Sequence, residues 1–216
     1  MAELIVVVDY GMGNLRSVAK AIEHVAPQGS AVQVTDDPAV VLSADRVVFP
    51  GQGAAADCMA ALRGRGLIEP LTEAARTRPF LGICMGMQVM LTHSEENGGV
   101  DLLNWFPGTV TRFPSQVDAA GNALKVPHMG WNGIRQTRAH PLWHGIADDA
   151  RFYFVHSYFC TPVDAGLTVG QTVYGLTYTA ALAAGFVFAI QAHPEKSADD
   201  GLRLLTNFTR WQGEFV

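Results

Sequence analysis

The chain has 216 residues, of which 15 are Lys or Arg and 20 are Asp or Glu, so its formal net charge is −5 at pH 7. Hydrophobic residues make up 49 % of the chain and charged residues 16 %, a composition that excludes a disordered or fibrous protein. We expect residues 1–216 to form a single domain around one large core. The negative charge, without a run of Lys or Arg, speaks against binding to nucleic acid or to an anionic membrane surface.

The N-terminal segment reaches Asp9 after only five apolar residues, which is too short for the apolar region of a signal peptide. The three cysteines, Cys58, Cys84 and Cys160, are odd in number and lack CxxC spacing. This pattern argues against a disulfide framework and against a zinc site, and it fits a reducing compartment. We therefore expect a cytoplasmic protein that holds no metal.

The first half of the chain alternates apolar runs with amphipathic stretches. Leu4 to Val8 is a continuous apolar run, as expected of a strand buried on both faces of a parallel sheet. Asn14 can cap a helix whose apolar residues recur at helical spacing as far as Val25. Further strands are expected at 31–34, 46–49 and 80–83, and further helices at Asp37-Pro38, from Ala54, and from Met85 to about Leu91. This alternation predicts an α/β fold with a three-layer, open and mostly parallel sheet.

Beyond Gly98-Gly99 the pattern changes to short β-rich pieces. Strands are expected at Thr109–Phe113, Ala123–Val126, Arg151–Val155 and Val187–Gln191, before a final helix from about Ala198 to Trp211. Residues 165–194 contain no Asp, Glu, Lys or Arg and are long enough to span a bilayer, but glycines and threonines punctuate them. Short buried strands joined by turns fit this stretch better, so the second half should add antiparallel strands to the sheet.

One expected strand end carries a candidate nucleophile. Gly82-Ile83-Cys84-Met85-Gly86 ends a strand and opens a helix, which is the thiol version of a nucleophile elbow. The flanking glycines allow a sharp turn, and a helix N-terminus favours the thiolate. The alternative is that Cys84 packs as a small apolar residue, as we expect for Cys58 and Cys160.

A thiol nucleophile needs a base and a group that orients the base. His193-Pro194-Glu195 follows another expected strand, so His193 can accept the thiol proton while Glu195 orients the imidazole. The alternative is a surface histidine beside a solvated glutamate. The two strand ends should converge on one crevice, because ligands of open parallel sheets bind beyond the carboxyl ends of the strands.

Acyl chemistry also needs donors for the developing oxyanion. The turn Pro50-Gly51-Gln52-Gly53 can offer the backbone N–H groups of Gly51 and Gln52, beside that of Met85. Its glycines would let a peptide of this turn reorient. The alternative is an ordinary turn between a strand and a helix.

The first expected strand is followed by a glycine turn, Gly11-Met12-Gly13, that suggests dinucleotide binding. The third glycine of the G-x-G-x-x-G pattern is replaced by Arg16, however, and no P-loop is present elsewhere. We therefore expect no nucleotide and no other cofactor.

With Gly-Ile-Cys84-Met-Gly-Met-Gln88 and Gln-Ala-His193-Pro-Glu195-Lys-Ser in view, the chain resembles the class I, triad-type glutamine amidotransferases. Within that family it is similar to the glutaminase subunits of imidazole glycerol phosphate synthases in histidine biosynthesis. The segments that carry this closer similarity are Asp9-Tyr-Gly-Met-Gly-Asn14-Leu-Arg-Ser, Pro127-His-Met-Gly-Trp-Asn132 and Phe154-Val-His-Ser-Tyr158.

The resemblance implies residue roles and a partner. Cys84 would be the nucleophile, His193 the base and Glu195 its orienting carboxylate. The L-glutamine substrate would be held by Gln88 and Glu96 together with the backbone of His156, Ser157 and Tyr158, while Asn14, Tyr153 and Lys196 would face the partner near the ammonia exit. That partner would be a cyclase subunit with a (β/α)8 barrel, joined to this chain in a heterodimer. Tyr153 could instead be core, and Lys196 a solvated charge.

The chain departs from the family pattern at two positions. Ala192 stands where a large aromatic residue usually precedes the histidine, and Gln52 replaces a commonly aliphatic residue in the oxyanion turn. Two other functions stay open from the residues alone. One is a free-standing cysteine hydrolase acting on γ-glutamyl peptides, and the other is a scaffolding subunit with an inactive site.

Overall fold

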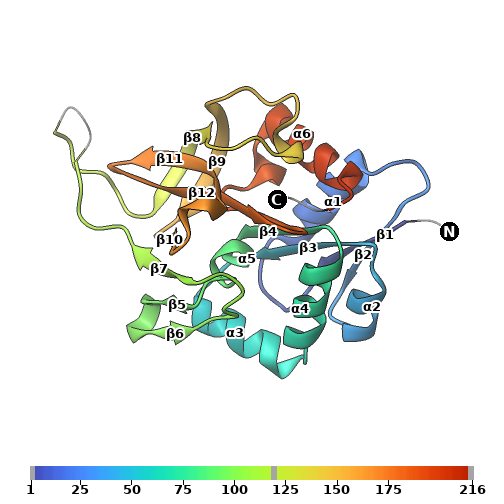
Figure 1. The fold of residues 1–216 in the computed structure, drawn as a ribbon. Helices are drawn as coiled ribbons and strands as arrows, with labels where there is room; N and C mark the ends of the chain where they lie inside the picture. Colours follow the sequence, from blue (N-terminus) through green and yellow to red (C-terminus); the bar gives the residue numbers. More distant parts are fainter. Residues whose placement is uncertain (1–2, 118–120, 214–216) are drawn as a thin grey trace.

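The structure, a computed structural model, describes residues 3–117 and 121–213 (Figure 1). The first half contains β1 (Leu4–Val8), α1 (Leu15–Val25), β2 (Ala31–Thr35), α2 (Pro38–Ser43), β3 (Arg46–Gly51), α3 (Ala55–Gly64), α4 (Ile68–Thr77), β4 (Phe80–Cys84) and α5 (Met85–Gln88). The second half contains β5 (His93–Ser94), β6 (Val100–Asp101), β7 (Gly108–Arg112), β8 (His128–Gln136), β9 (Ala150–His156), β10 (Tyr158–Pro162), β11 (Thr168–Tyr174), β12 (Leu176–Ala184), β13 (Val187–Ile190) and α6 (Ala198–Arg210).

The strands form a mixed sheet in the order β2-β1-β3-β4-β13-β12-β10-β7-β5-β6, from which β11, β8 and β9 branch through β12. The pairs from β2 to β13 are parallel, and β13 to β12, β12 to β10 and β10 to β7 are antiparallel. This confirms the predicted α/β fold, in which a parallel sheet carries added antiparallel strands.

Successive side chains of the parallel strands pack on opposite faces of the sheet. Ile5 and Val7 of β1 belong to the core beneath α1 and α6, whereas Val6 and Val8 belong to the core that α2, α3 and α4 cover. All four side chains are fully buried, which explains why the strand is a continuous apolar run rather than an alternating one. Helices therefore cover both faces, as the three-layer prediction requires (Figure 1).

Three expectations about local structure need correction, and one helix was not expected. The strand predicted at Ala123–Val126 is wrong, since Ala123 makes only an isolated bridge to Val117 and the next ladder begins at His128, after Pro127. Asn14 occupies the N-cap position of α1 but makes no side-chain cap hydrogen bond. Two further differences concern helices: one ends earlier than expected, and one was not expected.

The predicted helix from Met85 to about Leu91 ends at Gln88. Beyond this point the carbonyls of Val89 and Leu91 accept hydrogen bonds from the N–H groups of Leu103 and Asn104, so a distant loop takes the place of the helical partners. The sequence also missed α4, which contains Pro70. Proline is tolerated there because the N–H groups of a first helical turn have no partner within the helix.

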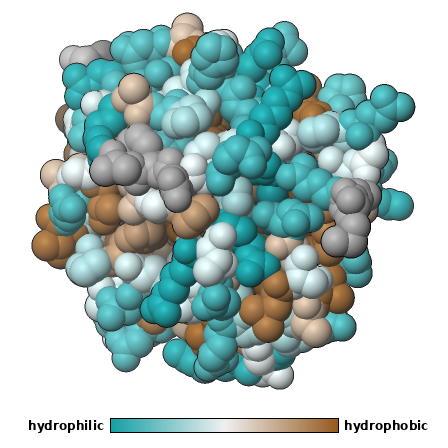
Figure 2. Space-filling view, turned by 45° about the vertical axis from the view of Figure 1, so that its right-hand side comes forward, coloured by the Kyte–Doolittle hydropathy of each residue, from teal (hydrophilic) through white to brown (hydrophobic). Residues whose placement is uncertain are grey.

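The uncharged stretch of residues 165–194 forms β11, β12 and β13, which confirms the expectation of short strands joined by turns. Among the residues that the structure describes, no helix is long and apolar enough to cross a membrane. The face seen in Figure 2 is mainly hydrophilic, with separate smaller hydrophobic areas.

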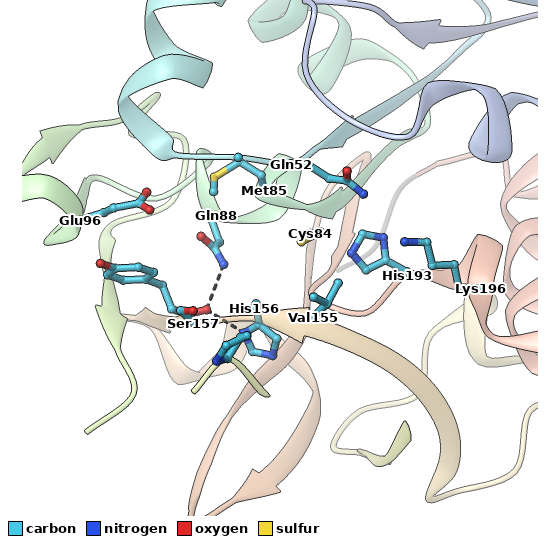
Figure 3. Close-up of a pocket in the computed structure, with 13 residues that line it drawn as sticks. Gln52, Cys84, Met85, Gln88, Glu96, Val155, His156, Ser157, His193 and Lys196 are labelled. Carbon is cyan, nitrogen blue, oxygen red and sulfur yellow. Dashed lines mark hydrogen bonds between the residues drawn. The ribbon is translucent and has the colours of Figure 1, made fainter. Parts of the chain in front are cut away.

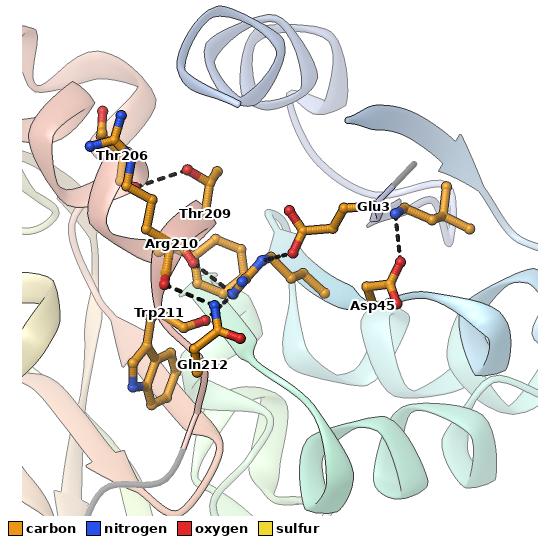
Figure 4. A network of polar contacts seen from close by, with 10 residues as sticks. Glu3, Asp45, Thr206, Thr209, Arg210, Trp211 and Gln212 are labelled. Carbon is orange, nitrogen blue, oxygen red and sulfur yellow. Dashed lines mark hydrogen bonds and ion pairs between the residues drawn. The ribbon is translucent and has the colours of Figure 1, made fainter. Parts of the chain in front are cut away.

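A buried arginine joins the two ends of the described chain. Arg46, only 3 % exposed, donates from Nη1 to the carbonyl oxygens of Phe208 and Trp211 and forms an ion pair through Nε with Glu3 at 2.6 Å (Figure 4). The last carbonyls of a helix have no partner within it, and a cation suits the negative end of the helix dipole. Arg46 thus anchors the C-terminal end of α6 to β3.

Candidate active site

Cys84 lies at the junction of β4 and α5 in a backbone conformation that non-glycine residues rarely adopt, with φ 55° and ψ −111°. The flanking glycines serve a different purpose from the one predicted. A Cβ on Gly86 would lie 1.9 Å from the carbonyl oxygen of Phe49, and one on Gly82 would lie 2.5 Å from Met90 Cε. The glycines therefore permit close packing around the elbow, and the strained turn itself falls on Cys84.

His193 and Glu195 form a buried pair, with Nδ1 of His193 2.9 Å from Oε1 of Glu195 and side chains 3 % and 1 % exposed. Burial of the ring opposes its protonation, but Cys84 and then Glu195 outweigh this effect and raise the pKa of His193 to about 10. His193 is thereby favoured as the imidazolium, the form it would take after accepting a proton from the Cys84 thiol.

The loop that carries His193 is fixed from β9. The backbone N–H of His193 donates to the carbonyl of Tyr153 at 2.8 Å, and Ser197 Oγ bridges the two segments by donating to the carbonyl of His193 and accepting from the N–H of Tyr153. Ala192, next to His193, is fully buried in the core. The position of the candidate base thus depends on contacts far apart in the sequence.

Cys84 and His193 line one cleft of about 470 Å³. The lining also includes Gln52, Gly53, Met85, Gln88, Glu96, Pro127, Val155, His156, Ser157, Tyr158 and Lys196. Figure 3 shows Glu96 toward one end of the cleft and Cys84 with His193 toward the other, with Gln88 between them. The structure therefore brings together all predicted substrate-holding residues, whereas Glu195 lies behind His193 and outside the lining.

The two side chains predicted to hold glutamine already have protein partners. The amide nitrogen of Gln88 donates to the carbonyl of Tyr158 at 3.0 Å and to Oε1 of Gln191 at 2.9 Å. Glu96 accepts the backbone N–H of Ala55 at 2.6 Å, so its carboxylate caps the first turn of α3. These three hydrogen bonds hold the two side chains in place at the edge of the cleft.

Gln191 is a site residue that the sequence reading missed. Its side chain is fully buried, and its Nε2 donates to Cys84 Sγ at 3.6 Å while its Oε1 accepts from Gln88. Its position at the end of an otherwise apolar strand could have pointed to it. An amide side chain that is buried there must find hydrogen-bond partners.

The predicted oxyanion turn lies directly beside Cys84, because Gly51 pairs with Cys84 in the parallel ladder between β3 and β4. A Cβ on Gly51 would lie 2.1 Å from Tyr10 Oη, so close packing, and not the backbone freedom predicted earlier, requires this glycine. Gly53 does adopt a positive φ of 93°. Cys58 donates from Sγ to the carbonyl of Gln52 at 3.5 Å and so holds one peptide of the turn.

The cysteines expected to be packing residues, Cys58 and Cys160, are both free and buried. Burial raises the pKa of the Cys58 thiol to about 11, so it stays protonated and can donate to the turn. The part of the chain that the structure describes contains no cluster of His, Cys, Asp and Glu able to hold a metal ion.

Of the three residues predicted to face a partner, Lys196 lines the cleft, whereas Asn14 and Tyr153 lie outside its lining. Lys196 Nζ lies 6.0 Å from the ring centroid of Tyr153, and the rings of Tyr153 and Trp131 lie 6.1 Å apart in an edge-to-face arrangement. Asn14 follows Gly13, where an added Cβ would lie 3.7 Å from the backbone nitrogen of Gln52 in the oxyanion turn. Trp131 was not singled out from the sequence, although it is 44 % exposed.

A thiol at a strained elbow, a buried histidine–carboxylate pair and a shared cleft define a cysteine-dependent enzyme of the α/β class. The family model "Glutamine amidotransferase class-I" matches residues 6–210. The chain belongs to this family of class I glutamine amidotransferases and, within it, to the family of imidazole glycerol phosphate synthase subunit HisH.

Two relatives illustrate the match. Imidazole glycerol phosphate synthase subunit HisH of Aromatoleum aromaticum is 58 % identical over 96 % of this chain and 98 % of its own length. The HisH 1 subunit of Pseudomonas aeruginosa is 54 % identical over 100 % of both chains. Among solved structures, PurLQS from Thermotoga maritima gives a TM-score of 0.70 at 17 % identity and covers 97 % of this chain and 99 % of its own, which supports the fold.

Proposed function

We propose that the chain is the glutaminase subunit of an imidazole glycerol phosphate synthase in L-histidine biosynthesis. It hydrolyses L-glutamine to glutamate and ammonia through a γ-glutamyl thioester on Cys84. The observation that carries this proposal is that the elbow thiol, Gln88 and His193 line the same cleft, with Glu195 paired to His193 behind it. The names of the relatives support the pathway and the subunit role.

The geometry supports a two-step reaction. His193 takes the proton of Cys84, and the sulfur attacks the γ-carboxamide carbon of glutamine. Backbone N–H groups of the turn at Gly51-Gln52 and of Met85 stabilise the oxyanion, and His193 returns its proton to the leaving nitrogen, which departs as ammonia. Water then attacks the thioester while His193 accepts a proton from it, and cleavage of the carbon–sulfur bond releases glutamate and leaves the sulfur of Cys84 to regain the proton from His193.

We further propose that the ammonia passes to a cyclase subunit, a (β/α)8 barrel that forms a heterodimer with this chain and makes imidazole glycerol phosphate and an aminoimidazole carboxamide ribotide. Met129 and Trp131 support this docking face, since they are 61 % and 44 % exposed on β8 beside Tyr153. Asn14 and Lys196 would lie at the rim of the same face. We place the pair in the cytoplasm, with residues 1–216 as one glutamine amidotransferase domain.

Activity should depend on the partner. The turn at Gly51-Gln52-Gly53 is the proposed switch, because reorienting one peptide would add or remove an oxyanion donor, and a missing donor costs roughly 10² to 10³ in rate. The Gly51–Gln52 peptide is the candidate, since Cys58 already binds the carbonyl of the next peptide.

The first test labels the chain with diazo-oxo-norleucine, an electrophilic glutamine analogue, and locates the adduct by mass spectrometry. We expect the adduct on Cys84, none in Cys84→Ala, and unchanged labelling in Cys160→Ala, which alters a buried thiol outside the cleft. The absence of an adduct in the wild type, even in complex with the ribotide-loaded partner, would favour the scaffolding alternative.

The second test co-purifies the chain with the cyclase subunit and measures glutaminase activity with and without the ribotide. We expect stimulation of glutamine hydrolysis by the ribotide-loaded partner. Cys84→Ala should abolish glutamine-dependent product formation and leave ammonia-dependent product formation nearly intact. Equal rates for the isolated chain and the ribotide-bound complex would contradict the proposed coupling and favour a free-standing hydrolase.

A further inference from the structure

A chain of hydrogen-bonded side chains lies beneath the cleft. Nδ1 of His128 lies 3.1 Å from Tyr178 Oη, which in turn lies 3.1 Å from Nε2 of His156. Nδ1 of His156 lies 2.8 Å from the carbonyl oxygen of Tyr158. At the far end, Nδ2 of Asn132 lies 3.4 Å from Nε2 of His128.

The last acceptor sets the direction of every bond. A carbonyl oxygen only accepts, so Nδ1 of His156 must carry a proton and, in the neutral ring, Nε2 must accept from the hydroxyl of Tyr178. Tyr178 Oη then accepts from the Nδ1–H of His128, and Nε2 of His128 accepts from Asn132. One arrangement of protons therefore gives every side chain in this series of hydrogen bonds a matching donor or acceptor.

The surroundings keep both rings neutral. Tyr178, His128 and His156 are 3 %, 3 % and 6 % exposed, and the ring of His128 stacks on the rings of Phe154 and Tyr174. Burial lowers the pKa of His128 to about 4 and that of His156 to about 3. A charged His156 would donate from Nε2 as well and leave the hydroxyl of Tyr178 between two donors, whereas a charged His128 would turn an N–H toward the amide nitrogen of Asn132.

This series of hydrogen bonds ends on the carbonyl oxygen of Tyr158, a residue that lines the cleft. The carbonyl of Tyr158 accepts both from His156 and from the amide of Gln88, and Gln88 continues through Gln191 to Cys84. Figure 3 shows the bonds from Gln88 and His156 converging on this carbonyl. His128, His156, Tyr158 and Tyr178 come from β8, β9, β10 and β12, so these hydrogen bonds link four strands to one wall of the cleft.

We propose that His128, Tyr178 and His156 form a positioning relay that fixes the carbonyl of Tyr158 and, through it, the amide of Gln88 in the glutamine cleft. The relay touches no reacting atom. Its contribution rests on the proposed glutaminase function, and it acts by holding the substrate-facing wall in one geometry. Breaking it should weaken glutamine binding more than it slows the chemical step.

Tyr178→Phe removes the central hydroxyl and keeps the ring. Without that donor, Nε2 of His156 loses its hydrogen-bond partner, and the ring is held only through its bond to the carbonyl of Tyr158. Tyr174→Phe is the matched control, because it removes another hydroxyl from the same aromatic cluster, one that donates to the carbonyl of Lys125 instead. The loss of one hydrogen bond corresponds to roughly a 2- to 10-fold effect.

The experiment compares both variants with the wild type in steady-state glutamine hydrolysis by the complex with the cyclase subunit, well below the melting temperature of each. We expect Tyr178→Phe to raise KM for glutamine about 3- to 10-fold with kcat within about 2-fold, and Tyr174→Phe to change neither beyond about 2-fold. Equal KM values for the two variants, or a loss confined to kcat, would overturn the relay.

A second readout does not depend on catalysis. In ¹⁵N NMR spectra of the wild-type chain at pH 7, the rings of His128 and His156 should both be neutral and protonated on Nδ1. Tyr178→Phe should shift the side-chain amide signals of Gln88, and Tyr174→Phe should leave them in place. If the protein shows these shifts but has no glutaminase activity, the relay stands and the proposed function is contradicted. If the protein is active but lacks the shifts, the relay is contradicted.

Discussion

The side-chain amide of Gln191 donates to the sulfur of Cys84 at 3.6 Å from a fully buried position. The same side chain accepts from Gln88, so it connects the nucleophile with the wall that is proposed to hold the substrate. A donor aimed at the sulfur favours its anionic form, because hydrogen bonds to charged groups contribute about 1.5–3 kcal/mol.

Gln191→Met should therefore slow the reaction of Cys84 with iodoacetamide by roughly 10-fold, since it keeps the side-chain volume but removes the donor. The rate of alkylation, followed by mass spectrometry on Cys84, measures this effect directly. Gln171→Met, which alters a partly exposed amide bonded to Arg135, is the control and should leave the rate unchanged. An unaltered alkylation rate in Gln191→Met would show that the contact does not tune the thiol.

The second prediction separates the roles of His193 and Glu195. The imidazole carries the proton, whereas the carboxylate orients the ring, so His193→Ala should reduce thioester formation at least as much as Glu195→Gln. Single-turnover measurements of thioester formation provide the test. If Glu195→Gln proved the more damaging change, the two roles would have to be revised.

The third prediction concerns the two glycines of the oxyanion turn. Gly51→Ala places a methyl group against Tyr10 Oη, so it should lower the melting temperature and both basal and stimulated activity. Gly53→Val, at φ 93°, should depress partner-stimulated activity more than basal activity. Gln52→Ala should be the mildest change, because the peptide N–H would act rather than the side chain. Greater damage from Gln52→Ala would contradict this ordering.

The fourth prediction is a pH dependence of stability. His128 and His156 have lowered pKa values of about 4 and about 3, while the ordinary value near 6.5 applies to the unfolded chain. Between pH 6.5 and about 4 the unfolded chain binds more protons, so the free energy of unfolding falls as the pH drops, by about 1.4 kcal/mol per unit for each histidine. This stabilisation is fully present above pH 6.5 and is lost as the pH falls through the folded-state values.

Urea unfolding between pH 4.5 and 6.5 measures that slope. His128→Gln should reduce it by about 1.4 kcal/mol per pH unit, whereas Tyr174→Phe keeps both histidines and should keep the wild-type slope. An identical slope in wild type and His128→Gln would show that His128 is not buried in its neutral form.

The fifth prediction concerns Arg46, which is buried against the last carbonyls of α6. Arg46→Met leaves the carbonyls of Phe208 and Trp211 without this donor and should cost about 3–5 kcal/mol of unfolding free energy. Glu3→Gln should cost no more than about 1 kcal/mol, because the Glu3 side chain is 30 % exposed and water screens its charge. Denaturant unfolding of both variants tests this, and equal costs would show that the ion pair, and not the carbonyl contacts, anchors the helix.

Local sequence was sufficient for the elements that carry the candidate site. An apolar run buried on both faces predicts a parallel strand, and Gly82 and Gly86 around Cys84 predict an elbow, because these features depend on side chains within a few residues of one another. His193 and Glu195 could be paired from the sequence for the same reason. The resemblance to class I glutamine amidotransferases added the residues of the cleft that no local pattern reveals.

Tertiary structure alone decided the contacts between distant segments. Gln88 and Tyr158 are 70 residues apart, Gln191 and Cys84 are 107 apart, and His128 meets Tyr178 across 50 residues. None of these pairs leaves a periodic signal, since each depends on which strands become neighbours in the sheet. The requirement for glycine at position 51 follows in the same way from Tyr10, which reaches it from a different strand end. Buried polar groups must find partners, and only the folded chain determines which partners lie within reach.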